Sequence, residues 1–183
     1  MKYAQMIIMS LTVLNLPAQL DLPSWLLPDT LGEYVTVYGF IYDQRDSLPS
    51  QGEVVVIKNG PAGGIHKFTS DKEGHFEVYL PSNGLYSVKI LKAGCITKTV
   101  EVNTTNVPKK AWRNKFALEM EVYMEKQPPG FDLALSKIPY SQVKYDPEFK
   151  FFVYDEEFEK ERRLAINQEL ERLKMTQIHA VKF

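Results

Sequence analysis

The chain has little of what metal sites, disulfides and reactive thiols are made from: one cysteine and three histidines in 183 residues. A single cysteine, Cys95, excludes an internal disulfide, so the domain must fold on its hydrophobic core alone. Cys95 is expected within a strand, where a buried thiol is inert. His66, His75 and His179 are far apart and fall in different predicted elements, whereas a zinc site needs several ligands at fixed spacing.

Motifs of catalysis are also missing from the sequence. No serine lies in a Gly-x-Ser-x-Gly elbow, and the glycines at 60, 63 and 64 lack the strand-to-helix context and the lysine of a phosphate-binding loop. We therefore expect no enzyme activity, no cofactor and no metal. Acidic residues of the predicted turns could meet at one end of the fold and bind calcium, although solvated turn residues are the favoured interpretation: Asp43, Asp46, Asp71 and Glu73.

Charge of one sign does not dominate the chain either. Its 22 basic and 23 acidic residues give a net charge of -1, and the two signs are mixed along the sequence. Nucleic acid and anionic membrane surfaces both attract basic patches, so neither is an expected partner. With 44% hydrophobic and 25% charged residues, the composition is that of an ordinary folded domain with an appendage.

The N-terminus resembles an export signal over residues 1–19. Lys2 supplies a positive start, residues 6–14 are apolar, and Ala18 lies near a plausible cleavage position. The apolar run is too short to span a bilayer, so no transmembrane segment is expected in the mature chain. No cysteine follows the run, which argues against a lipid anchor. The prediction is a periplasmic or exported protein, and the alternative is that this run is a buried N-terminal element.

Residues 20–33 form a predicted lead-in to the domain. Two prolines, Pro23 and Pro28, break any helix or strand. Trp25 and the two leucines after it are expected to pack over the domain's own sheets, and the alternative is a docking patch for another protein.

From Tyr34 onward the pattern changes to alternation of apolar and polar residues, which is typical of half-buried strands. A turn at 71–74 precedes a strand in which Phe76, Val78 and Leu80 share one face. The sequence thus predicts a mainly β fold over 34–126, a seven-stranded antiparallel β-sandwich. The seven runs lie at 34–42, 53–58, 65–69, 76–80, 85–91, 95–102 and 115–124.

Several of these runs share spaced motifs. The motifs are Val37-x-Gly39-x-Ile41-x-Asp43, Leu48-Pro49 before Gly52-x-Val54-x-Val56, Thr69-x-Asp71-x-x-Gly74-x-Phe76-x-Val78-x-Leu80-Pro81, Tyr86-x-Val88 and Ala93-Gly94. In this order they resemble the carboxypeptidase regulatory-like domain, a transthyretin-like β-sandwich, over roughly 34–124. The resemblance implies an accessory or interaction module without a catalytic motif. Cys95 departs from it, because the family often has an aromatic residue after that glycine.

A C-terminal extension, 127–183, follows the sandwich. It is predicted to contain a strand at about 149–154, aromatic on both faces, and an amphipathic helix at about 155–175 that begins at the N-cap Asp155. A strand apolar on both faces needs cover on both sides, either from its own domain or from a partner. The residues predicted to contact a partner are Phe149, Phe151, Phe152, Tyr154, Phe158, Ile166 and Leu170.

Three functions remain open at this point. The first is a non-enzymatic periplasmic structural or protein-interaction module of the cell envelope, with an envelope protein as its partner. The second is a carbohydrate-binding module that uses tyrosines on one sheet face to bind a glycan. The third is an accessory domain of a separate enzyme. The tyrosines of the second hypothesis are Tyr38, Tyr42, Tyr79 and Tyr86.

Overall fold

The structure of the protein, a computed structural model, describes residues 23–26, 32–61 and 63–180, with side chains of the last helix described as far as Thr176. The predicted export signal, 1–19, and most of the predicted lead-in lie outside the described residues. Of the lead-in, Leu26 is buried in the core and Trp25 packs against it, as expected for a segment that lies over its own domain.

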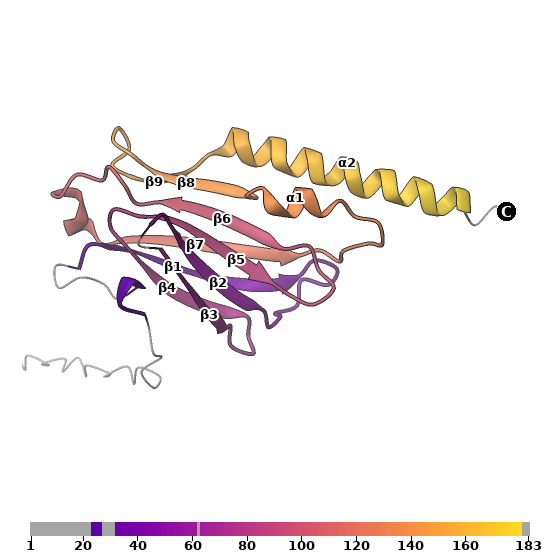
Figure 1. Cartoon of the computed structure of the whole chain (residues 1–183), viewed down its shortest axis with the longest axis horizontal. Helices are drawn as coiled ribbons and strands as arrows, with labels where there is room; N and C mark the ends of the chain where they lie inside the picture. Colours follow the sequence, from indigo (N-terminus) through magenta and orange to yellow (C-terminus); the bar gives the residue numbers. More distant parts are fainter. Residues whose placement is uncertain (1–22, 27–31, 62, 181–183) are drawn as a thin grey trace, which may run out of the picture.

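The described part of the chain forms two facing sheets and two α-helices (Figure 1). The smaller sheet has the strand order β4-β1-β7, and the larger has the order β3-β2-β5-β6-β8-β9. The strands are β1 (Tyr34–Asp43), β2 (Glu53–Asn59), β3 (Gly64–Thr69), β4 (His75–Pro81), β5 (Leu85–Leu91), β6 (Lys98–Asn103), β7 (Phe116–Met124), β8 (Ser141–Asp146) and β9 (Phe151–Tyr154). The helices are α1 (Leu133–Lys137), α2 (Glu156–Ala180) and the 3₁₀ turns η1 (Ser24–Leu26) and η2 (Ala111–Asn114).

The seven predicted strands all form, as β1 to β7, but the prediction of a purely antiparallel, seven-stranded sandwich is wrong. The described residues contain nine strands, and both sheets are mixed. β7 runs parallel to β1, and β8 runs parallel to β6. Alternation within a segment indicates a strand and its buried face, but it carries no information on the direction of the neighbouring strand.

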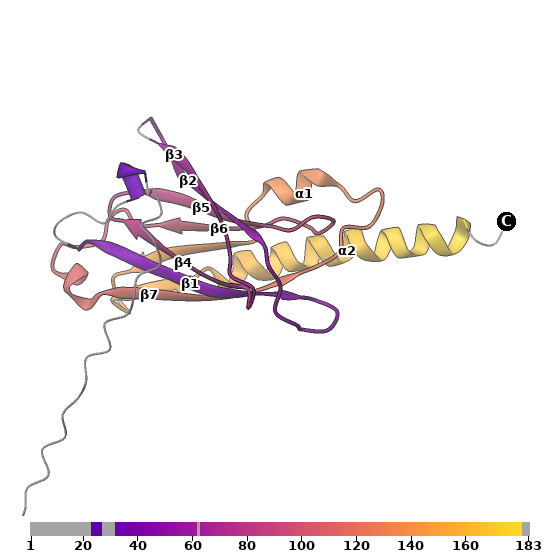
Figure 2. The same cartoon turned by 90° about the horizontal axis from the view of Figure 1, so that it is seen from below.

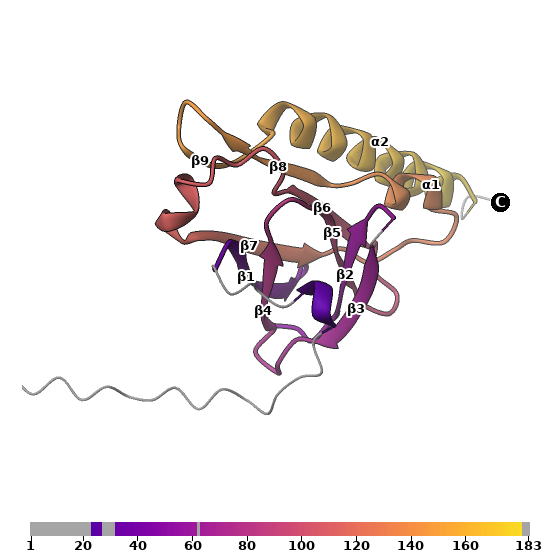
Figure 3. The same ribbon diagram turned by 60° about the vertical axis from the view of Figure 1, so that its left-hand side comes forward.

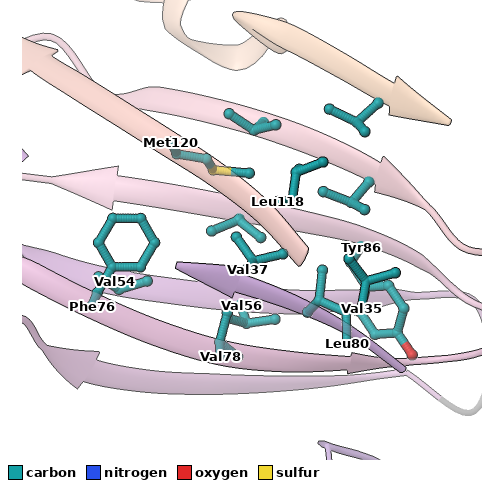
Figure 4. Close-up of a cluster of buried hydrophobic side chains, with 14 of the residues drawn as sticks. Val35, Val37, Val54, Val56, Phe76, Val78, Leu80, Tyr86, Leu118 and Met120 are labelled. Atoms are coloured by element: carbon teal, nitrogen blue, oxygen red, sulfur yellow. The ribbon is translucent and has the colours of Figure 1, made fainter. Parts of the chain in front are cut away.

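The core lies between the two sheets and follows from the alternation along each strand. On β7, residues Phe116, Leu118, Met120, Val122 and Met124 are buried, while the residues between them are exposed. Side chains from both sheets meet in this layer, and Figure 4 shows valines of β1 and β2 beside them. This is the packing expected of a β-sandwich.

The turn before β4 forms as the sequence predicts. Gly74 has a φ of +77°, and a Cβ at this position would collide with the backbone oxygen of Ile41. The carboxylate of Asp71 accepts a hydrogen bond of 2.7 Å from the backbone N–H of His75. Glycine is required at 74 both by its left-handed conformation and by this close approach.

The C-terminal extension folds back onto the sandwich. β8 continues the larger sheet beyond β6, and β9 continues it beyond β8. The predicted strand at 149–154 begins two residues late: Phe149 lies in the turn before β9 and is 72% exposed, whereas Phe152 is 3% exposed and belongs to the main core. Phe152 packs edge-on against Phe116 of β7, with their ring centroids 5.1 Å apart.

Helix α2 begins where the sequence predicts, and the backbone N–H of Phe158 donates to the Asp155 carboxylate. It lies along β8, and its C-terminal part extends beyond the strands (Figures 1, 2 and 3). Its apolar stripe docks on a second core, in which Ile166 and Leu173 meet Ile96 and Phe131. The predicted helix thus forms with its apolar stripe buried, but it continues to Ala180, five residues beyond its predicted end at about 175.

A buried arginine ties α2 to the segment before β8. The guanidinium of Arg162 donates to the backbone oxygens of Leu135, at 2.6 Å, and Pro139, at 3.0 Å. Burial lowers the pKa of Arg162, and the carbonyl oxygens compensate its charge in place of water. The short helix α1, which sequence reasoning does not predict, supplies one of these carbonyls.

Replacement of Phe152 by alanine should destabilise the whole protein if the extension is part of the sandwich. We expect a loss of about 3–5 kcal/mol in the free energy of unfolding, because the change opens a cavity between the sheets. Phe149→Ala, three residues away and exposed, is the matched control and should change stability by less than about 0.5 kcal/mol. Urea unfolding followed by circular dichroism measures both. If both substitutions changed the free energy of unfolding by the same small amount, the extension would not be packed on the sandwich.

Candidate ligand-binding face

The outer face of the smaller sheet gathers several aromatic residues, of which Tyr123 is exposed and the others are half-buried. Alternate residues of β1 point away from the core, and the register places Tyr38 between Glu77 of β4 and Glu119 of β7. We call this surface the tyrosine–glutamate face. Its residues are Tyr34, Tyr38, Phe40, Tyr42, His75, Glu77, Tyr79, Glu119, Glu121 and Tyr123.

The rings of this face lie in two groups. Tyr42 and Tyr123 are stacked, with centroids 5.1 Å apart and an interplanar angle of 24°, and Phe40 continues the group at 6.3 Å from Tyr42. Tyr34 and Tyr79 meet edge to face at 5.2 Å. Neighbouring strands hold the rings in place, so the aromatic surface is preformed.

Each of three tyrosines on the face donates its hydroxyl to a neighbouring glutamate. Tyr38 donates to Glu119 at 3.5 Å, Tyr123 donates to Glu121 at 3.5 Å, and Tyr79 donates to Glu77. The hydrogen bond to Glu77 raises the pKa of Tyr79 to about 12, and the charge of Glu121 raises the pKa of Tyr123. The hydroxyls of Tyr79 and Tyr123 therefore stay protonated at neutral pH.

The face is acidic as well as aromatic. Its three glutamates are exposed, and no outward position of β1, β4 or β7 holds lysine or arginine. Such a surface offers ring faces for apolar contact and carboxylate oxygens that accept hydrogen bonds. It can hold a neutral or positively charged ligand, and it repels a negatively charged one.

Sequence reasoning found three residues of this face, Tyr38, Tyr42 and Tyr79, but was wrong about Tyr86. Tyr86 is fully buried between the sheets, where Figure 4 shows its hydroxyl at the edge of the cluster. It belongs to the inward set of β5, with Val88 and Ile90. The remaining members of the face were missed, although the aromatic residues at alternate positions of β1 were a usable signal.

The predicted partner-contacting residues of the extension fall into two groups. Phe152 and Ile166 are buried in the protein's own cores, and Tyr154, Phe158 and Leu170 are half-buried. Phe149 and Phe151, which are 72% and 49% exposed, lie together at the β8–β9 turn. Intrachain packing thus accounts for the first group, and the second group remains on the surface.

Three of the predicted turn acids, Asp43, Asp46 and Asp71, accept hydrogen bonds from backbone N–H groups of their own turns. Asp43 forms ion pairs with Arg45, at 3.1 Å, and Lys92, at 3.5 Å, and the hydrogen bond from Arg45 holds its pKa well below the usual range. Across the described residues, no group of three or more His, Cys, Asp or Glu side chains gathers as a metal site would require.

Cys95 was expected in mid-strand, and this is wrong. It lies in the turn after Gly94, half-buried, and makes an isolated bridge to Lys126 before β6 begins at Lys98. The glycine's positive φ of 74° turns the chain here and delays the strand.

The fold and the face together define a β-sandwich with a preformed aromatic surface. No protein-family model matches the chain, and none of the curated proteins matches it. Within the described residues, no helix is long and apolar enough to cross a membrane.

Solved structures resemble the chain weakly. Catechol 1,2-dioxygenase from Acinetobacter sp. ADP1 superposes with a TM-score of 0.40 at 11% identity, over 56% of this chain and 55% of the dioxygenase. CueP gives 0.35 at 15% identity, over 52% and 65% of the two chains, and the group B streptococcus pilus 2b backbone protein gives 0.34 at 15%, over 50% and 40%. The chain spans about 55–60% of the length of the first dioxygenases it matches. Scores this low carry no information about function.

The buried Tyr86 hydroxyl makes stability depend on alkaline pH. It has no hydrogen-bond partner, and burial raises the pKa of Tyr86 to about 12. A tyrosine of the unfolded chain ionises near pH 10. The stability that Tyr86 contributes is therefore fully present below about pH 10 and is lost as the pH rises toward 12.

Tyr86→Phe should flatten this alkaline loss. Between pH 7 and pH 11, the free energy of unfolding of the variant should fall by on the order of 1 kcal/mol less than that of the parent protein. At pH 7 it should be equally stable or more stable by about 1 kcal/mol, because it removes an unpaired buried hydroxyl. Urea titrations at pH 7, 10 and 11 measure both effects. If the stability of the two proteins depended on pH in the same way, the alkaline loss would not come from ionisation of Tyr86.

Proposed function

We propose that the protein is an exported, non-enzymatic binding module and that the tyrosine–glutamate face binds carbohydrate. The observation that carries the proposal is the set of three tyrosines on one sheet face whose hydroxyls are held by glutamates while their rings remain accessible. The arrangement of the carboxypeptidase regulatory-like motifs supports an accessory module, and the N-terminal apolar run supports export.

The geometry suits a linear glycan that runs along β1. Outward residues recur every two positions, which is about 7 Å along a strand. The apolar faces of sugar rings near the two ends of such a glycan can stack on Tyr42 with Tyr123 and on Tyr34 with Tyr79, because Tyr34 and Tyr42 lie at opposite ends of β1. Sugar hydroxyls between these groups can donate to the carboxylates of Glu77 and Glu119, which flank Tyr38.

Charge selects among glycans. The face carries three carboxylates and no Lys or Arg at the outward strand positions, so an acidic glycan would meet repulsion. Neutral sugars and amino sugars fit, and amino sugars gain attraction. Non-specific binding by exposed aromatic side chains would not discriminate between neutral and acidic glycans, so this selectivity distinguishes the proposed site from such binding.

A glycan array with the full chain tests the proposal. We expect saturable binding to neutral or amino-sugar polymers, about tenfold stronger than to acidic polymers of the same length. Tyr42→Ala should weaken binding about tenfold, because it removes the ring that stacks on Tyr123. Phe149→Ala is the control, since it removes an exposed aromatic residue outside the face. A silent array, or equal binding by the Tyr42 and Phe149 variants, would contradict the proposal.

The second candidate function is docking of an envelope protein through the β8–β9 turn, with the chain as a structural or accessory partner. Its support is the exposure of Phe149 and Phe151, which lie two positions apart in the sequence. Exposed aromatic residues are enriched at protein–protein interfaces. The partner that docks here could itself be an enzyme, in which case this chain would be the accessory domain of that enzyme.

Replacement of both phenylalanines by serine should separate the two candidates. The double variant is expected to lose most of any envelope protein recovered by the parent chain, and to keep its glycan binding. Affinity capture from envelope extract, quantified by mass spectrometry against Leu133→Ser, an exposed apolar residue of α1, measures the loss. Unchanged recovery from the double variant would exclude docking through this turn.

A further inference from the structure

A groove of about 720 Å³ lies between β7 and the first turns of α2. We call it the β7–α2 groove. Its lining comes from four elements: consecutive residues of β7, Lys98 and Val100 of β6, Ser141 of β8, and Glu156, Glu159 and Arg163 of α2. Its size is within the range of sites that hold small molecules or peptide segments.

The side of the groove formed by β7 is a strand edge. Within the described residues β7 pairs with β1 alone, as the last strand of its sheet. The hydroxyl of Tyr154 donates to the backbone oxygen of Glu119 at 2.8 Å, so this carbonyl points away from β1, whereas the oxygen of Met124 accepts from Gln44 next to β1. Along a strand, the backbone N–H and C=O groups of successive residues point alternately to one side and to the other. Glu121 and Tyr123 are two and four residues after Glu119, so their N–H and C=O groups also point away from β1 and face the groove.

The groove carries an excess of negative charge. Five glutamates line it, at 119, 121, 125, 156 and 159, against two cations, which leaves three negative charges in excess. Both cations already have partners: Lys98 pairs with Glu125 at 3.1 Å, and Arg163 pairs with Glu159 at 3.8 Å. Charge complementarity therefore favours a basic ligand.

Two buried polar atoms in the groove have no partner. Ser141 is 1% exposed, and its Oγ makes no hydrogen bond. Glu125 uses Oε1 for Lys98, while its Oε2 is buried without a donor. Lys98 itself is fixed, with its ammonium 4.2 Å from the centre of the Tyr140 ring. An unpaired carboxylate oxygen is costly in a folded protein, and a donor from a ligand would satisfy it.

We propose that the β7–α2 groove binds an extended segment of a partner protein, which adds to β7 as a new strand and directs a lysine or arginine side chain toward Glu125. Main-chain hydrogen bonds to Glu121 and Tyr123 supply binding energy, and the basic side chain supplies specificity. The negative charge of the glutamates along this edge disfavours pairing with strands that lack basic residues, including β7 of another copy of the protein. This site adjoins the tyrosine–glutamate face, because Glu119, Glu121 and Tyr123 belong to that face and also line the groove.

Fluorescent heptapeptides that alternate valine and threonine, with lysine, arginine, serine or glutamate at the centre, test the proposal with the full chain. By anisotropy, the lysine and arginine peptides should bind about tenfold more tightly than the serine and glutamate peptides. Hydrogen exchange followed by NMR should show protection of the Glu121 and Tyr123 amides on binding. A lysine peptide methylated at alternate backbone nitrogens cannot pair, and it should bind about tenfold more weakly.

Two neighbouring glutamates of α2 provide a matched pair of variants. Glu156 lines the groove and Glu157 does not, and both are exposed, so neither substitution should affect folding. Glu156→Lys should weaken binding of the lysine peptide about fivefold, and Glu157→Lys should leave it within about twofold. Equal effects of the two variants, equal binding of the serine peptide, binding without amide protection, or no binding of any peptide would each overturn the proposal.

Discussion

The parallel pairing of β6 with β8 is the contact on which the rest of the structure depends. Four residue pairs, from Val100 with Ser141 to Asn103 with Lys144, carry the extension back along the larger sheet. Without them that sheet would end at β6 with an open edge. The pairing also places β9 over the end of the core and sets α2 beside β8, so the second core and the β7–α2 groove both follow from it.

Strand β7 gives the molecule three different surfaces at once. Met120 and its alternate neighbours fill the core, while Glu119, Glu121 and Tyr123 complete the tyrosine–glutamate face. The free edge of the same strand borders the groove. This is possible because strand side chains alternate between two faces while the backbone hydrogen bonds point sideways.

Two buried cations hold the extension in one orientation. Lys98 is paired with Glu125 and covered by Tyr140, and Arg162 is held by backbone carbonyl oxygens before β8. Removing the partners of either cation would leave its charge buried and without compensation. These contacts add directional constraints that the apolar contacts of α2 do not provide.

The sequence by itself determined the local structure: seven strands from alternation, the turn at Gly74 from its conformational freedom, and the start of α2 from Asp155. These depend on neighbours a few residues apart. Only the tertiary structure decided that β1 and β7 run parallel and that β8 and β9 extend the larger sheet. The partner of a strand and the direction of that pairing depend on residues far away in sequence, which local periodicity does not encode.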